Sequence, residues 1–151
     1  MPGLEDLYQE LILDHYRNRR GEGHLDDPTV EVDQNNPLCG DVVHLELKIQ
    51  DGRIAEVGHT GEGCSISRAS ASMLAETLPG STIEEAFDRI ERFRQMMHGE
   101  EIEDEDLGDA IALSGVAKFP ARIKCALLSW TATNEALLTY QSDARSNGDG
   151  H

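Results

Sequence analysis

Apolar residues near the start of the chain recur at steps of three and four positions. The recurring residues are Leu4, Leu7, Tyr8, Leu11, Ile12 and His15. This spacing gives a helix one apolar face, so an amphipathic helix is predicted. We expect it to fade near Arg19 and Arg20, before Gly21 and Gly23. Residues 21–38 are rich in acids and amides and contain two prolines, which favours an extended connection.

A second pattern has a period of two. Val43, Leu45, Leu47 and Ile49 alternate with His44, Glu46 and Lys48. Strict alternation predicts a half-buried strand. Asp51-Gly52 is a hairpin turn signal, so a second strand is predicted over residues 53–59. We interpret the histidines on or near these strands, His44 and His59, as surface or core-edge residues.

Asp41 has the same parity as the apolar positions of the first strand. If that strand begins early enough, the carboxylate of Asp41 points to the inner side of the sheet. An unpaired charge there is costly, so Asp41 needs a partner or a metal ion.

Residues 64–74 are rich in small side chains and predict a helix that ends before Pro79-Gly80. Cys64 is then at or near the start of this helix, where the unpaired amides and the helix dipole favour a thiolate. The sequence Ser81-Thr82-Ile83-Glu84 is a capping-box pattern, and it predicts a further helix up to about His98.

The last third of the chain begins with an acidic stretch, residues 100–106, which we interpret as a solvated linker. A short helix is expected over residues 107–113, before Gly115. Pro120 suits the first turn of a long final helix, whose apolar pattern extends to Leu138. Residues 1–141 are therefore expected to form one domain, and the polar residues 142–151 a disordered tail.

The charge of the chain limits its partners. Its 151 residues suit a single domain with a substantial core. A formal net charge of −16 argues against nucleic acid or an anionic membrane surface as the main partner. The first residues lack the pattern of a signal peptide, and no apolar run approaches the length of a membrane span. With an odd number of cysteines and no export signal, we expect a cytoplasmic protein.

Each of the three cysteines is in a local setting that suits a metal ligand. The blocks are Asn36-Pro37-Leu38-Cys39-Gly40-Asp41, Gly61-Glu62-Gly63-Cys64 and Phe119-Pro120-Ala121-Arg122-Ile123-Lys124-Cys125. Three thiolates and the Asp41 carboxylate make four ligands, the number that a tetrahedral zinc site needs. Inert buried thiols are the alternative, although the glycines and the aspartate favour a metal or reactive-thiol site.

These blocks, together with the small-residue run 65–72, resemble the NifU/IscU-like iron–sulfur cluster assembly family over nearly the whole chain. Within the family they are similar to the SufU branch. Lys124 stands where the IscU scaffolds carry a histidine before the third cysteine. The Leu-Pro-Pro-Val-Lys chaperone motif of those scaffolds is absent, and the segment between the second and third cysteines is longer.

The resemblance implies an α+β fold, with a small antiparallel sheet of about three strands covered by helices. It places a further strand between Val30 and Asp33. It also implies a tightly bound Zn²⁺ and a SufS-type cysteine desulfurase as the sulfur donor, with downstream iron–sulfur assembly proteins as later partners. The metal ligands would be Cys39, Asp41, Cys64 and Cys125.

On this interpretation the protein is a zinc-dependent sulfurtransferase acting with the desulfurase. Cys39 is the expected persulfide acceptor, because it is in a loop entry while Cys64 and Cys125 are on helices. Arg122 is an auxiliary residue that offsets the negative charge of the ligands. Two alternatives stay open: a scaffold that binds iron or an iron–sulfur cluster through the same cysteines, and a structural zinc-binding module.

Overall fold

The computed structural model of the chain describes residues 4–37, 40–100, 102 and 107–149. In chain order, the elements are α1 (Leu4–Arg17), β1 (Val30–Asn36), β2 (Asp41–Gln50), β3 (Arg53–Glu62), α2 (Ser65–Thr77), α3 (Ile83–Met97), the 3₁₀ helix η1 (Gly108–Lys118) and α4 (Pro120–Asp149).

The strands form one antiparallel sheet in the order β1-β2-β3. Asp51 and Gly52 join β2 to β3 with φ angles of 54° and 75°, the left-handed conformations that a tight hairpin turn requires. The predicted α+β class is therefore confirmed. β1 and β3 are longer than expected, since they reach Asn36 and Glu62.

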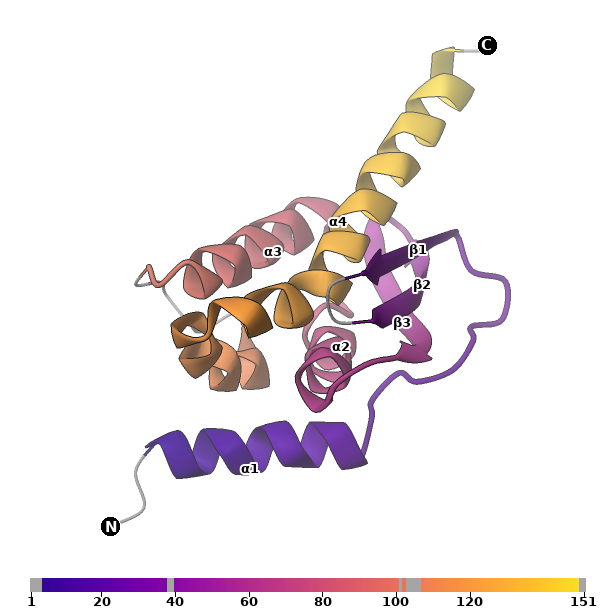
Figure 1. Cartoon of the computed structure of the whole chain (residues 1–151). Coiled ribbons are helices and arrows are strands. Elements are labelled where there is room, and N and C mark those ends of the chain that lie inside the picture. The colour runs from indigo at the N-terminus through magenta and orange to yellow at the C-terminus, as the bar shows by residue number, and fades with distance from the viewer. Residues whose placement is uncertain (1–3, 38–39, 101, 103–106, 150–151) are drawn as a thin grey trace.

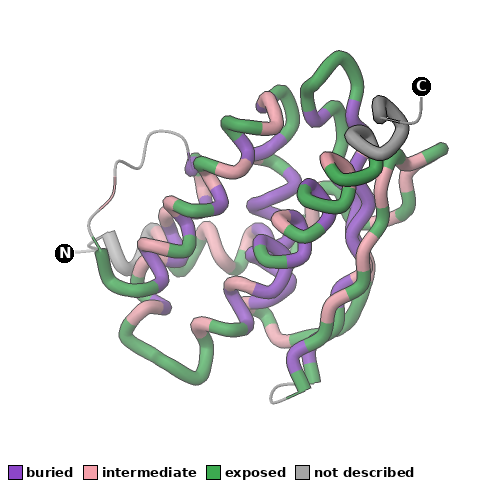
Figure 2. Tube along the Cα trace, turned by 90° about the horizontal axis from the view of Figure 1, so that it is seen from above, coloured by how far each residue is buried: buried purple, intermediate pink, exposed green. Residues whose placement is uncertain are grey.

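One face of the sheet is buried by helices. Figure 1 shows α2 and α4 beside the sheet, with α1 on the far side of α2 and α3 next to α4. Val43, Leu45 and Leu47 of β2 point to this inner face and are almost fully buried, as the alternation predicts. In Figure 2 the buried positions gather where the helices meet one another and the sheet.

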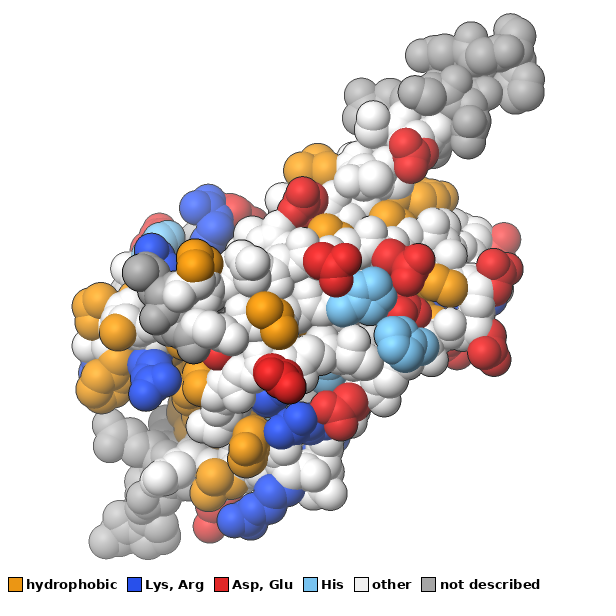
Figure 3. Space-filling view, turned by 45° about the vertical axis from the view of Figure 1, so that its right-hand side comes forward, with side chains coloured by type: hydrophobic (Ala, Val, Ile, Leu, Met, Phe, Trp, Pro, Cys, Tyr) orange, Lys and Arg blue, Asp and Glu red, His pale blue; other side chains and the backbone are white. Residues whose placement is uncertain are grey.

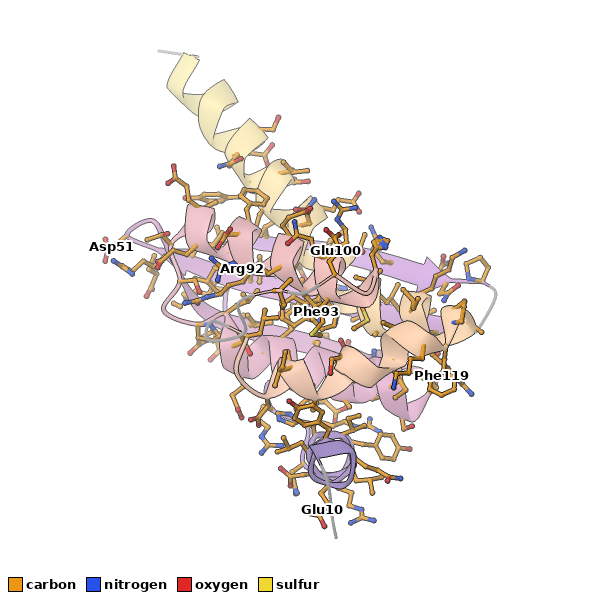
Figure 4. All side chains as sticks on the ribbon, turned by 90° about the vertical axis from the view of Figure 1, so that its left-hand side faces the viewer. Glu10, Asp51, Arg92, Phe93, Glu100 and Phe119 are labelled. Atoms are coloured by element: carbon orange, nitrogen blue, oxygen red, sulfur yellow. The ribbon has the colours of Figure 1, made fainter. Side chains whose placement is uncertain are left out.

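Trp130 of α4 connects the core to α2 and α3. Its ring stacks on Phe93 with the centroids 4.2 Å apart, and Figure 4 shows Phe93 in the middle of the helical layer. The Trp130 Nε1 donates a hydrogen bond to Ser70 Oγ at 2.9 Å, and that hydroxyl donates to the carbonyl of Ala126 at 2.6 Å. The buried polar atoms of these side chains are thus paired, which fixes α4 against the small-residue helix α2.

Two helix boundaries in the structure differ from those predicted from the sequence. The capping box of α3 is made by Thr82 and Glu85, one residue later than predicted. The Ser81 hydroxyl is not available as a cap, because it is buried and accepts a hydrogen bond from Arg89. The short helix that we expected to end before Gly115 is instead a longer 3₁₀ helix, which continues through this glycine to Lys118.

The end of the chain also differs from the expectation. α4 continues to Asp149, so most of the stretch that we expected to be a disordered tail belongs to a helix. In Figure 1 this last part of α4 extends beyond the sheet. The domain boundary at residue 141 stays a prediction. In the acidic stretch, residues 101 and 103–106 lie outside the described residues. No helix in the described part of the chain is long and apolar enough to cross a membrane.

Candidate metal centre

Cys64 caps the N-terminus of α2. Its backbone is extended, with φ −71° and ψ 170°, and its Sγ accepts a hydrogen bond from the Ser67 amide at 3.5 Å. The sulfur therefore lies beside the N-terminal amides of α2, at the positive end of the helix dipole. The predicted position of Cys64 at the helix start is confirmed.

Asp41 is the first residue of β2, and only 1% of its surface is exposed. Its Oδ1 accepts a hydrogen bond from the Cys64 amide at 3.0 Å, and its Oδ2 lies 3.8 Å from the Cys64 sulfur. Gly63 makes this approach possible, because a Cβ atom there would lie 2.7 Å from Asp41 Oδ1. The strand does begin early enough to turn the carboxylate inward, as the parity argument required.

Cys125 is buried near the beginning of α4, with its sulfur 3.9 Å from the carbonyl of Ala121. One ligand atom each from Asp41, Cys64 and Cys125 lies within 4.8 Å of the other two. Two sulfur ligands on a tetrahedral zinc ion are about 3.8 Å apart, and a sulfur and an oxygen slightly less. The donor types, and the 3.8 Å between Asp41 Oδ2 and the Cys64 sulfur, therefore fit Zn²⁺. Cys39 lies outside the described residues, so its part in the site stays a prediction.

Arg122 lies beside the thiols, and its role as an auxiliary residue stays a prediction. The charge of Cys64 and a hydrogen bond to Cys125 raise the pKa of the Arg122 guanidinium above its ordinary value. Lys124 is also close to Cys125 in the sequence, but it is exposed and lines a hollow with Gln34 and Asn35. Of the two cations, the structure brings Arg122 to the site.

Arg68 of α2, with only 1% of its surface exposed, is a further residue near the ligands that was not predicted from the sequence. Its Nη2 donates to the carbonyl of Val42 at 3.2 Å, and its buried Nε and Nη1 have no hydrogen-bond partner among the described residues. Burial, then the neighbouring Arg19, lowers the pKa of Arg68, while Asp41 and Cys64 are among the groups that oppose this shift. Arg68 therefore adds buried positive charge next to the ligands. The sequence does contain a signal for Arg68, because Arg68 is the only charged residue in the small-residue run 65–72.

An apolar groove with a volume of about 670 Å³ adjoins the site. Its lining includes Tyr8, Ile12, Ile66, Val116, Phe119 and Arg122. Phe119 is 61% exposed, and Figure 4 shows it at the outer end of the molecule, where η1 meets α4. Arg122 borders both the groove and the thiols, so the groove lies next to the candidate centre.

A three-stranded sheet with helices on one face, and a thiol–carboxylate cluster where a strand and two helices begin, defines a class of α+β domains with a thiol-containing site. The family described as the NifU-like N terminal domain matches residues 7–143, and the chain belongs to this family. The resemblance inferred from the cysteine blocks is thereby confirmed.

Three relatives refine this assignment. The chain is 49% identical to the zinc-dependent sulfurtransferase SufU of Bacillus subtilis (strain 168), over 89% of this chain and 91% of that protein. It is 41% identical to the iron–sulfur cluster assembly scaffold protein IscU of Streptococcus pyogenes serotype M1, over 89% and 84%. A solved structure of a putative iron–sulfur cluster assembly scaffold protein for the SUF system, from Fervidobacterium islandicum AW-1, superposes with a TM-score of 0.82 at 32% identity, covering 89% of this chain and 99% of that one.

Proposed function

We propose that this protein is a zinc-dependent sulfur acceptor for iron–sulfur cluster assembly, supplied with persulfide sulfur by a SufS-type cysteine desulfurase. The observation that carries the proposal is the convergence of Asp41, Cys64 and Cys125, whose ligand atoms lie within 4.8 Å of one another. The 49% identity to a protein named as a zinc-dependent sulfurtransferase supports the choice of metal and of reaction.

The proposal takes Cys39 as the fourth ligand, because it stands two residues before Asp41 in the sequence. Zinc, when bound, keeps coordinating thiols deprotonated at neutral pH and has no redox chemistry of its own. Arg68 and Arg122 place positive charge next to a ligand set that is otherwise anionic. The chain's own residues thus stabilise both the ligand thiolates and an incoming anionic persulfide.

The sulfur transfer is a thiol–persulfide exchange at Cys39. The Cys39 thiolate attacks the outer sulfur of the desulfurase persulfide, which forms a sulfur–sulfur bond on Cys39 and breaks the one in the desulfurase. The desulfurase cysteine leaves as a thiolate, and the transferred sulfur keeps the negative charge that it carried in the desulfurase persulfide. No external oxidant or reductant is needed. Arg122, next to Cys64 and Cys125, is placed to orient the anionic persulfide.

The apolar groove beside Arg122 supports the choice of a protein as the sulfur donor. A persulfide on a partner has to approach the thiols past Arg122, so the partner surface around it must cover the neighbouring groove. The exposed ring of Phe119 at this groove gives that partner an apolar contact. We therefore assign the groove to the desulfurase.

The experiment that tests the function is mass spectrometry of the protein after incubation with desulfurase and cysteine. Wild type should gain a sulfur adduct of about 32 Da, and Cys39→Ser should lose it while still binding the desulfurase in a pull-down. A persulfide found only on Cys64 or Cys125, or normal desulfurase activation by Cys39→Ser, would remove Cys39 from this role.

The scaffold function is the second candidate, because a relative at 41% identity is named as an iron–sulfur cluster assembly scaffold protein. The same thiolates bind iron readily. Aerobically purified protein that is colourless and holds zinc in its cysteine site supports the sulfur acceptor, whereas a brown protein with iron and labile sulfide supports the scaffold. A protein that holds zinc but neither accepts sulfur nor stimulates the desulfurase would be a structural zinc module.

A further inference from the structure

The connection between α1 and β1 crosses the outer face of the sheet, away from the cysteine site. Gly58 of β3 is paired with Glu46 of β2, and a Cβ atom on Gly58 would lie 3.0 Å from both the Gly23 carbonyl oxygen and Leu25 Cγ. The missing side chain lets the connection lie close to the strands. As a result Glu46 is only 2% exposed, although it alternates with the residues of the inner face.

The two carboxylate oxygens of Glu46 have different surroundings. Oε1 accepts a hydrogen bond from the Leu25 amide at 2.8 Å, which fixes the orientation of the carboxylate. Oε2 lies 2.5 Å from His24 Nδ1 and 2.9 Å from His44 Nε2. The imidazoles belong to the crossing connection and to β2, with their centroids 5.7 Å apart. Figure 3 shows histidine side chains among acidic ones on this face of the molecule.

A second layer of contacts holds His44 in place. Its other ring nitrogen, Nδ1, lies 2.8 Å from Asp33 Oδ1 on β1, so a ring whose Nε2 binds a metal ion can donate its Nδ1 proton to Asp33. Histidine ligands of metal ions in proteins almost always make this contact with a carboxylate or carbonyl group. Glu31 Oε1 lies 3.2 Å from Nε2 and adds a further oxygen close to the same point.

We propose that His24, His44 and Glu46 form a second metal site, which takes a divalent transition-metal ion and suits Zn²⁺. Their ligand atoms lie within 4.8 Å of one another. Two imidazoles and one carboxylate are a common zinc ligand set that leaves coordination positions for water. His24 is 70% exposed, so an ion reaches the site directly from solvent. The site is separate from the cysteine centre, because Asp41 and Glu46 point to opposite faces of β2.

Without a metal ion, the same three side chains make a network of histidine–carboxylate ion pairs, and metal counting distinguishes the two states. The purified full chain is equilibrated with buffered free Zn²⁺, and its zinc is measured by mass spectrometry. Wild type should hold two ions per chain, and His24→Asn and His44→Gln one each. His98→Asn is the matched control and should hold two, because His98 is an exposed histidine that belongs to none of the three clusters of potential metal ligands among the described residues.

The cysteine centre is tested separately in the same assay. Cys64→Ser combined with Cys125→Ser should lose one ion and keep the other, so failure of the cysteine site leaves the histidine site measurable. Retention of all zinc by both His24→Asn and His44→Gln would overturn the second site. Since His24 is largely exposed, its replacement leaves the fold intact and the comparison valid.

The Asp33 contact gives a sharper test of the geometry. Asp33→Asn removes the carboxylate behind His44 without touching the three ligands, and loss of such a contact weakens metal binding roughly 10- to 100-fold. A calorimetric Zn²⁺ titration of the Cys64→Ser, Cys125→Ser protein with and without Asp33→Asn should show this change in dissociation constant. An unchanged constant would contradict the assigned role of His44.

Discussion

The carboxylate of Asp41 and the backbone amide of Cys64 are joined by a hydrogen bond, with 3.0 Å between Oδ1 and the nitrogen. This contact ties the first residue of β2 to the residue that caps α2. Two of the proposed metal ligands therefore keep their relative position through the protein itself. Asp41 has a structural role in the site as well as its proposed role as a ligand.

Asp41→Ala separates these roles. The three thiols can still hold zinc, so we expect zinc at the cysteine centre to stay near one ion per chain while sulfur transfer falls much further. Loss of the hydrogen bond between the buried Asp41 carboxylate and the Cys64 amide should also lower the free energy of unfolding by about 1–3 kcal/mol. Zinc content, persulfide formation and urea unfolding are measured on one preparation.

Asp41→Asn is the matched control, because it keeps the side-chain volume and an acceptor oxygen but removes the charge. It should recover most of the lost stability and little of the transfer. A folded Asp41→Ala protein with no zinc in the cysteine centre would show that the carboxylate is essential for binding, and our assignment would fail.

The order and type of the elements can be predicted from local sequence patterns. Strict alternation in residues 43–49 defines β2, and Asp51-Gly52 defines its hairpin. The capping box was misplaced by one residue because Ser81 and Thr82 are each followed three positions later by a glutamate. Only the burial of Ser81 decides between them, and that is a property of the folded chain.

The cysteine centre could be predicted in part, because two of its residues carry local sequence signals. Glycine before Cys64 and the strand parity of Asp41 are local signals, and both residues lie where these signals place them. The cluster of His24, His44 and Glu46 has no such signal. It forms because Gly58 lets a distant connection cross the sheet, so the sequence led us to interpret His44 as a surface or core-edge residue and gave no interpretation of His24.

Arg68→Met tests the buried positive charge near the ligands. The guanidinium has two nitrogens without hydrogen-bond partners among the described residues, so replacement by a side chain of similar length should change the stability of the zinc-free protein little. Zinc affinity of the cysteine centre should fall about 10-fold or more, since one unit of charge near two thiolates is worth at least about 1.4 kcal/mol at low dielectric. Competition with a chromophoric chelator measures the affinity.

Arg94→Met is the control for a general effect of charge. Arg94 is an exposed arginine of α3 that pairs with Glu91 and lies outside the candidate site. Its replacement should leave zinc affinity unchanged. Equal losses in the two variants would point to the net charge of the protein, and an unchanged affinity in Arg68→Met would contradict the role of the buried guanidinium.

His59 makes the stability of the fold depend on pH. The side chain is completely buried, and its Nε2 donates to the carbonyl of Arg20 at 2.7 Å. Burial lowers the pKa of His59 below its ordinary value of 6.5; the hydrogen bond to Arg20 and the charge of Glu22 oppose this shift, while Arg68 and Arg19 add to it. The folded protein therefore keeps the imidazole neutral at a pH where the unfolded chain takes up a proton. Its contribution to stability is complete above pH 6.5 and is lost as the pH falls below that value.

The measurement is urea unfolding of wild type and His59→Asn between pH 7.5 and 5.5. Below pH 6.5 the free energy of unfolding of wild type should fall more steeply than that of the variant, with a difference in slope of at most about 1.4 kcal/mol per pH unit, the value for one proton. His98→Asn, which removes an exposed histidine, serves as the control and should follow the wild-type profile. Because other groups titrate in the same range, the difference between the two profiles isolates His59. Parallel profiles for wild type and His59→Asn would mean that His59 titrates alike in the folded and unfolded chain, contrary to the effect expected from its burial.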